Sequence, residues 1–325
     1  MTVSRAFKKD ASISSEKREK ILSIARQYGY IPNKAAIRLT QCTICIGVII
    51  MDAISDFTSK IIAGLNVAYK ELMDYKVEMD LRVVKPGTPT SQYIRMFEEF
   101  IKNGCQGILF SIDDYSDEFI AKLNEYAEMN IFMASIVEQY NGIKNLCNVF
   151  FNPELKGKMA CELLSSCING KHIAVFTGPQ KTYIYKSLLS CFFTEAKKRG
   201  LFVDCVYDTK NDPLLAAEQI RTALTDFPDI NGIYISSANS VPILDTLIDM
   251  KKTKDIRVIA SDVFPRMKEY LNNGDVTATI FQNQYKQAKE AMIYLYNCIA
   301  GNEPLKEQIF IEPIIVINSN IDLYL

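Results

Sequence analysis

Few side chains in this sequence have the spacing that acid–base or nucleophilic chemistry requires. The single histidine, His172, follows Gly170 and Lys171 and opens an apolar segment, with no nucleophile or orienting carboxylate indicated beside it. Asp113 and Asp114 are adjacent. Adjacent side chains point in different directions, which favours ligand hydrogen bonding or solvation over an acid–base pair. We therefore expect a structural role for His172, and we expect that the protein is not an enzyme.

Motifs that hold a phosphate, a metal ion or an acyl intermediate are also missing from the sequence. It has no G-x-G-x-x-G or G-x-x-x-x-G-K-[ST] loop and no G-x-S-x-G turn. Cys42 and Cys45 form a close pair without a second pair or a nearby histidine, so buried packing is a better interpretation than a zinc site. We expect no cofactor and no bound metal.

Charge is distributed unevenly along the chain of 325 residues, whose net charge is −1. Residues 1–41 contain nine Lys or Arg and three Asp or Glu, a net charge of +6, so the remainder carries −7. This basic segment indicates contact with nucleic acid or another anionic surface, or else a solvated charged helix. We see neither a membrane-spanning segment nor a secretory signal, so we expect a cytoplasmic protein with reduced cysteines and no membrane contact.

The elements that must position the polar groups follow two different patterns. Ser14 is placed to cap a helix that ends at Gly29, and Asn33 can cap a short helix over 34–39. From residue 43 onward, apolar segments alternate with amphipathic helices. The expected strands are 43–51, 76–84, 106–112, 131–136, 172–177, 202–207, 232–236, 256–260 and 314–317. This pattern predicts two tandem α/β units with parallel sheets and a ligand cleft between them.

Ordered motifs in the sequence resemble the lactose-repressor (LacI/GalR-type) family of bacterial transcription regulators. They are T-V-S-R at 2–5, I-S-x-x-x-R-E-K-I at 13–21, G-Y-I-P-N at 29–33, A-x-x-L at 36–39 and I-G-V-I at 46–49. The resemblance covers essentially the whole chain. It implies an α/β fold with two doubly wound parallel-sheet subdomains of the periplasmic-binding-protein type I kind, after a partial N-terminal helical DNA-binding head.

The same resemblance implies three domains. The head and its hinge helix take residues 1–41, the N-terminal sensor subdomain takes 42–148 plus 284–309, and the C-terminal sensor subdomain takes 149–283 plus 310–325. We expect the chain to cross between the lobes near 147–151, 281–284 and 309–313. Several crossings tie two lobes together in a way that lets them hinge without separating.

For the head, the resemblance places T-V-S-R on the recognition helix of a helix-turn-helix whose first helix this sequence lacks. Thr2 and Ser4 would face base edges or phosphate, and Arg5 the DNA backbone. Asn33 would begin the hinge helix, and Leu39 would wedge into the minor groove. A late-assigned start or a truncated chain is favoured over a true loss of this helix. Without its supporting helix, so short a recognition helix is unstable, and we expect the chain as written to bind operator DNA poorly.

For the cleft, the resemblance implies a small-molecule effector, often a sugar or a nucleobase. The residues that it indicates as ligand-binding are Phe57, Asp114, Asn152, Ser237, Asp262 and Gln282. Phe57 would stack on a ring, Asp262 would accept hydrogen bonds from hydroxyls, and Gln282 would both donate and accept. The alternative for Asp262 is a helix cap or a turn residue.

The sequence departs from the family at two positions of the cleft. The slot of a frequent arginine falls on Leu188, and the Asp-Asn pair before the second lobe reads Phe151-Asn152. Two hydroxyl anchors are therefore missing, which suggests a less polar, modified or aromatic ligand. Tyr185 or Lys186 could substitute.

Taken together, these features predict a dimeric repressor-like transcription factor whose carbohydrate-like effector controls the order of the hinge helices. The alternative is a solute-binding sensor module without DNA binding, because the helix-turn-helix is incomplete.

Overall fold

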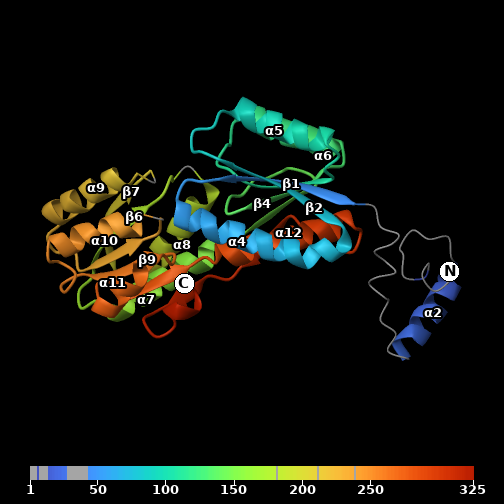
Figure 1. The fold of residues 1–325 in the computed structure, drawn as a ribbon. Coiled ribbons are helices and arrows are strands. Elements are labelled where there is room, and N and C mark those ends of the chain that lie inside the picture. Colours follow the sequence, from blue (N-terminus) through green and yellow to red (C-terminus); the bar gives the residue numbers. More distant parts are fainter. Residues whose placement is uncertain (1–5, 7–13, 28–42, 181, 211, 238) are drawn as a thin grey trace.

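The computed structural model describes residues 6, 14–27, 43–180, 182–210, 212–237 and 239–325. Within these ranges the chain forms two six-stranded sheets in two lobes (Figure 1). In the first lobe the strand order is β11 (Gln308–Ile311), β5 (Leu146–Phe151), β4 (Phe132–Ile136), β3 (Gly107–Ser111), β1 (Ile44–Met51) and β2 (Val77–Val84). In the second it is β12 (Ile314–Val316), β10 (Ala278–Phe281), β9 (Arg257–Ser261), β8 (Gly232–Ile235), β6 (His172–Thr177) and β7 (Phe202–Asp208). Only the pairing of β12 with β10 is antiparallel among these described strands.

Helices cover both faces of each sheet. The first lobe has α4 (Ser55–Leu72) and α12 (Gln284–Ile299) on one face, with α5 (Thr90–Lys102) and α6 (Asp117–Glu128) on the other. The second lobe has α7 (Pro153–Cys167) and α8 (Tyr183–Lys198) on one face, with α9 (Pro213–Asp226), α10 (Ser240–Asp249) and α11 (Met267–Asn273) on the other. Short 3₁₀ turns occur at Met73–Tyr75 and Ile321–Leu323, and α2 (Ser15–Gln27) precedes both lobes.

Burial on both faces explains why the strands are apolar throughout rather than alternating. In β1, Ile46, Val48 and Ile50 pack into the core below α4 and α12, whereas Ile49 packs into the core below α5 and α6. A central parallel strand therefore needs apolar side chains in both directions. The expected fold class of two doubly wound parallel-sheet subdomains is confirmed.

Three crossings connect the lobes. The first follows β5 and enters α7, the second lies between β10 and α12, and the third lies between β11 and β12. Strand β5 stays in the first sheet as far as Phe151, whereas we expected the boundary at 148, because all of its residues pair with β4 or β11. Asn152 then caps α7, its Oδ1 accepting from Leu155 N at 3.0 Å.

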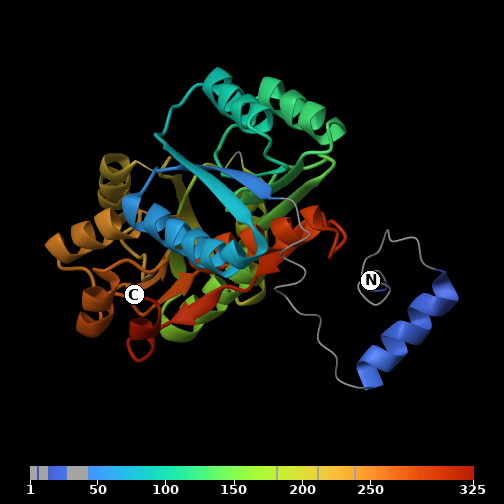
Figure 2. The same ribbon diagram turned by 45° about the vertical axis from the view of Figure 1, so that its right-hand side comes forward.

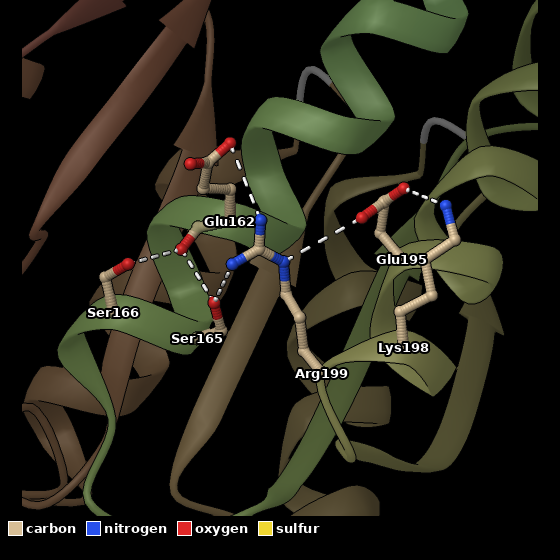
Figure 3. Close-up of polar contacts among 6 residues, drawn as sticks. All are labelled: Glu162, Ser165, Ser166, Glu195, Lys198 and Arg199. Atoms are coloured by element: carbon tan, nitrogen blue, oxygen red, sulfur yellow. Dashed lines mark hydrogen bonds and ion pairs between the residues drawn. The ribbon is translucent and has the colours of Figure 1, made fainter.

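Helices α7 and α8 of the second lobe pack closely together directly after the first crossing. A Cβ at Gly157 on α7 would lie 2.3 Å from the carbonyl oxygen of Leu188 on α8, so only glycine permits this approach. Figure 3 shows the polar contacts at the far end of the same helix pair, where Arg199 contacts Glu162, Ser165 and Glu195. In the first lobe, α4 lies beside α12 in both views of the chain (Figures 1 and 2), and Gly64 makes the matching close approach to Tyr285.

In the head, the structure describes the helix that Ser14 was expected to precede, and Ser14 O accepts from Arg18 N at 2.9 Å. The short helix expected over 34–39 and the DNA contacts expected of Thr2, Ser4, Arg5, Asn33 and Leu39 lie outside the described residues. Among the helices that the structure does describe, none is long and apolar enough to cross a membrane.

Candidate ligand-binding site

A cavity of about 130 Å³ lies between the lobes, at the carboxyl ends of strands from both sheets. The loops that follow the parallel strands lie at this edge of each sheet, and ligands of open α/β sheets bind there. The first lobe contributes Met51, Ala53, Ile54, Phe57, Thr58, Ile61, Ser111, Ile112, Asp113, Val137, Glu138 and Phe151. The second contributes Lys156, Thr182, Ile184, Tyr185, Ser236, Asp262 and Gln282.

Asp262 and Gln282 form the polar part of the second-lobe wall. Asp262 is 0% exposed, and its Oδ2 accepts from Gln282 Nε2 at 2.9 Å. The other oxygens of the two side chains, Asp262 Oδ1 and Gln282 Oε1, are buried and have no hydrogen-bond partner among the described residues. Burial raises the pKa of Asp262, against the opposing effects of Lys156 and Gln282. Two residues that line the cavity therefore each keep an acceptor oxygen that could take a hydrogen bond from a ligand.

Lys156 adds a buried cation to the same wall. It is 1% exposed, and its Nζ lies 4.8 Å from the centroid of the Phe151 ring. Burial lowers the pKa of Lys156, and the nearby Asp262 carboxylate partly counteracts this effect. Within the described parts of the chain, the ammonium has neither a hydrogen bond nor an ion pair.

The first-lobe wall presents Glu138, which is half-buried. Burial raises its pKa to about 7, although the Tyr115 hydroxyl donates a hydrogen bond to its carboxylate. The loop that carries Glu138 is fixed by the buried Asn148, whose Oδ1 accepts from Tyr140 N at 2.8 Å and whose Nδ2 donates to Tyr140 O at 2.9 Å. This wall can therefore offer either a donor or an acceptor near neutral pH.

Backbone strain occurs on both walls. Val137 has φ +71° and Asp262 has φ +68°, each at the residue that follows a central strand. A left-handed conformation is rare for non-glycine residues and especially so for a β-branched side chain. Such strain is often found at binding sites, where the surrounding structure holds it in place.

Two aromatic side chains supply apolar surface. Phe57 stands on the first turn of α4 and Tyr185 on the first turn of α8, so they come from opposite lobes. Gly178 makes room for Tyr185, because a Cβ there would lie 2.4 Å from its ring. The pair suits the C–H faces of a ring-shaped ligand.

The structure brings together only some of the expected ligand-binding residues. Phe57, Asp262 and Gln282 line the cavity. Asp114 lies in an adjoining groove of about 740 Å³, and hydrogen bonds from Thr90 and Ser116 lower its pKa in spite of its burial.

The other two expected residues have local structural partners instead. Asn152 caps α7, and Ser237 is buried against Thr209 and Asn239, with distances of 3.4 Å to each. Ser236, one position earlier, lines the cavity. A register difference of one residue at the end of a strand turns the side chain to the other side.

Sequence reasoning also missed Lys156 and Glu138. Lys156 shares the buried stripe of α7 with Ala160 and Leu164, four and eight residues later, so a lysine at this spacing on an apolar helix face was the available signal. Leu188, at the slot of the family's arginine, is instead core. Lys186 is exposed.

His172 lies away from this edge, at the amino end of β6. Its Nδ1 is 3.0 Å from Asp204 Oδ1, and its ring stacks on Phe202. These contacts give the histidine a structural role, as expected. The described residues contain no group of three or more side chains that could hold a metal ion.

Fold and cavity define a two-lobed α/β protein with a cavity between its lobes. The chain belongs to the family described as "Periplasmic binding protein domain", whose model matches residues 46–303. The model of "Bacterial regulatory proteins, lacI family" matches residues 1–33.

Individual proteins similar to this chain include a repressor and solute-binding proteins. A ribose operon repressor from Lactococcus lactis subsp. lactis (strain IL1403) is 21% identical over 310 residues, which cover 94% of this chain and 89% of the repressor. A glucose-galactose binding protein from Geobacillus stearothermophilus is 20% identical with a TM-score of 0.75, over 88% of this chain and 100% of that one. A solute-binding protein from Actinobacillus succinogenes with bound D-allose has 17% identity and a TM-score of 0.76, over 87% and 100%.

Proposed function

We propose that this protein is a cytoplasmic, DNA-binding transcriptional regulator, acting as a homodimer, whose affinity for operator DNA responds to a carbohydrate-like effector in the interlobe cavity. The observation that carries the proposal is the combination of this cavity with an N-terminal segment that matches regulators of the lacI family. The similarity to a ribose operon repressor over 94% of the chain supports it.

The chemistry of the cavity supports a polyhydroxylated effector. Among the described residues, Asp262 Oδ1 and Gln282 Oε1 have no hydrogen-bond donor and the Lys156 ammonium has no acceptor, and Phe57 and Tyr185 offer apolar faces. A sugar presents hydroxyl groups around its edge and C–H groups on its faces, so both kinds of surface would be used.

The position of the cavity provides a route from effector to DNA. Lys156 follows the first crossing by a few residues, and Gln282 lies within the second. A ligand that bridges the lobes favours one arrangement of these crossings, and the hinge segment before β1 would respond. The change in DNA affinity is bounded by the effector's differential affinity for the two arrangements, typically about 5- to 150-fold.

DNA binding by the whole chain tests the proposal. DNA duplexes that the protein binds are selected from a random pool with and without D-ribose, D-allose, D-galactose and myo-inositol. The selected duplexes are then titrated with the protein by fluorescence anisotropy at low and at physiological salt. We expect a preferred sequence whose affinity changes with one of these compounds. Absence of sequence-preferring binding under every condition would contradict the proposal.

A second candidate is a solute-binding sensor that does not bind DNA. The similarity of the fold to solute-binding proteins favours it. The same experiment separates the two, because the sensor would show ligand-induced thermal stabilisation and no preferred duplex.

A further inference from the structure

The cavity is lined by a buried cation, that of Lys156, with which no described residue forms an ion pair or a hydrogen bond. The Lys156 side chain is 1% exposed, and its Nζ lies over the face of the Phe151 ring, 4.8 Å from the centroid. A buried ammonium without a hydrogen-bond acceptor costs several kcal/mol. Its presence at a cavity wall therefore indicates that something else supplies the acceptor.

A residue of opposite charge, Asp262, lines the same cavity. Asp262 is 0% exposed, and its Oδ1 has no partner, while Oδ2 is occupied by Gln282 Nε2. The ammonium and the carboxylate attract each other electrostatically, but among the described residues they form no direct ion pair. The donor and the free acceptor are thus separated, and both line the cavity.

We propose that Lys156 and Asp262 clamp two adjacent hydroxyl groups of an uncharged polyol. Lys156 Nζ donates to one hydroxyl oxygen, and the neighbouring hydroxyl donates to Asp262 Oδ1. This proposal rests on the proposed function and specifies the binding residues of the same site. Its cation comes from α7.

The charges around the cavity favour a neutral ligand over an anionic one. The described lining residues include three carboxyl groups, those of Asp113, Glu138 and Asp262, and one ammonium, that of Lys156. Lys60 lies close enough to influence Asp262, but its Nζ donates to Tyr324 O at 2.7 Å and it does not line the cavity. A phosphate or carboxylate on the ligand would meet net negative charge in a poorly solvated space.

Ligand titrations of the whole chain test the clamp. The probes are D-ribose, D-allose, D-galactose and myo-inositol, with D-ribose 5-phosphate as the charged comparison, measured by thermal shift and calorimetry. We expect at least one neutral probe to bind. In Lys156→Met and Asp262→Asn its affinity should fall at least about tenfold, the usual effect of losing a hydrogen bond to a charged group. The matched control Lys186→Met removes an exposed lysine from the next helix and should bind like the parent.

The melting of the ligand-free variants separates binding from a structural role. Lys156→Met removes an unpaired buried charge, so its ligand-free midpoint should equal or exceed that of the parent. A lysine that held Asp262 in place would lower the midpoint when removed.

Four results would overturn the inference. They are unchanged affinity in Lys156→Met, a lowered ligand-free midpoint in that variant, tighter binding of the phosphate ester than of any neutral probe, and no binding of any neutral probe. Each leaves the selection of DNA sequences unaffected, so failure of the clamp and failure of the regulator proposal can be told apart.

Discussion

Gln282 donates from Nε2 to Asp262 Oδ2 at 2.9 Å, and each of the two side chains keeps one buried oxygen that no described residue contacts by a hydrogen bond. Their strands, β9 and β10, are neighbours in the second sheet, so the contact joins two loops at the same sheet edge. The site is therefore partly organised before any ligand arrives, which reduces the cost of ordering it on binding.

This hydrogen bond should also stabilise the ligand-free protein. Gln282→Leu leaves the buried Asp262 carboxylate without its side-chain donor, so we expect the free energy of unfolding to fall by about 1–3 kcal/mol. Urea denaturation measures the change. In the background of Asp262→Asn the same replacement should cost less, by about 1 kcal/mol. Equal costs in both backgrounds would show that the contact contributes nothing.

Glu138 should make stability depend on pH. Its pKa is about 7 in the folded protein and lower in the unfolded chain, where a glutamate titrates near 4.3. Between these values the folded state binds more protons, so stability falls as pH rises from about 4.5 to about 7 and then levels off. We expect a loss of about 1–3 kcal/mol, given that the residue is half-buried.

Glu138→Gln removes the titrating group, and its unfolding free energy should be flatter across that pH range. Denaturation series at several pH values compare it with Glu218→Gln, which changes an exposed glutamate on α9. A steep dependence that survives in Glu138→Gln and is lost in the control would contradict the assignment.

Gly157→Ala should destabilise the second lobe. Alanine normally improves a helix by about 1 kcal/mol over glycine. Here its Cβ would lie 2.3 Å from the backbone oxygen of Leu188, which cannot rotate away. Overpacking then outweighs the helix preference, and we expect a net loss of about 1–3 kcal/mol. Lys158→Ala, at the next and exposed position of α7, should change stability by less than about 0.5 kcal/mol. Thermal denaturation of the two variants makes the comparison, and equal stability would refute the packing argument.

The ion pairs at the other end of the same helices should matter less. Arg199 is 3.7 Å from Glu162 and 3.9 Å from Glu195, at the protein surface (Figure 3). Exposed pairs of this kind contribute about 0–1 kcal/mol and are screened by salt. Arg199→Met should therefore cost under about 1 kcal/mol, and the difference should shrink in high salt. A loss comparable with that of Gly157→Ala would mean that the network, and not the backbone approach, holds α7 to α8.

The sequence by itself predicted nine of the twelve described strands and the order in which they follow one another along the chain. Strands such as Ile44–Met51 are apolar at almost every position because both of their faces are buried. Such a continuous apolar segment can be recognised in the sequence without knowledge of its neighbours. The pattern was less informative near the crossings, where β5, β10, α11, α12 and β11 were not predicted as elements. Short strands of four to six residues carry little periodicity of their own.

Only the tertiary structure decided which polar side chains meet in the cavity. The family resemblance indicated all four of Asp262, Gln282, Asn152 and Ser237. In the structure Asp262 and Gln282 line the cavity, whereas Asn152 and Ser237 have local hydrogen-bond partners. Lys156 stands 106 positions before Asp262 in the chain, on a helix beyond a lobe crossing. The number of positions between Lys156 and Asp262 does not indicate how close their side chains lie in space. That closeness depends on how the helix layer packs on the sheet and not on the conformation of either segment.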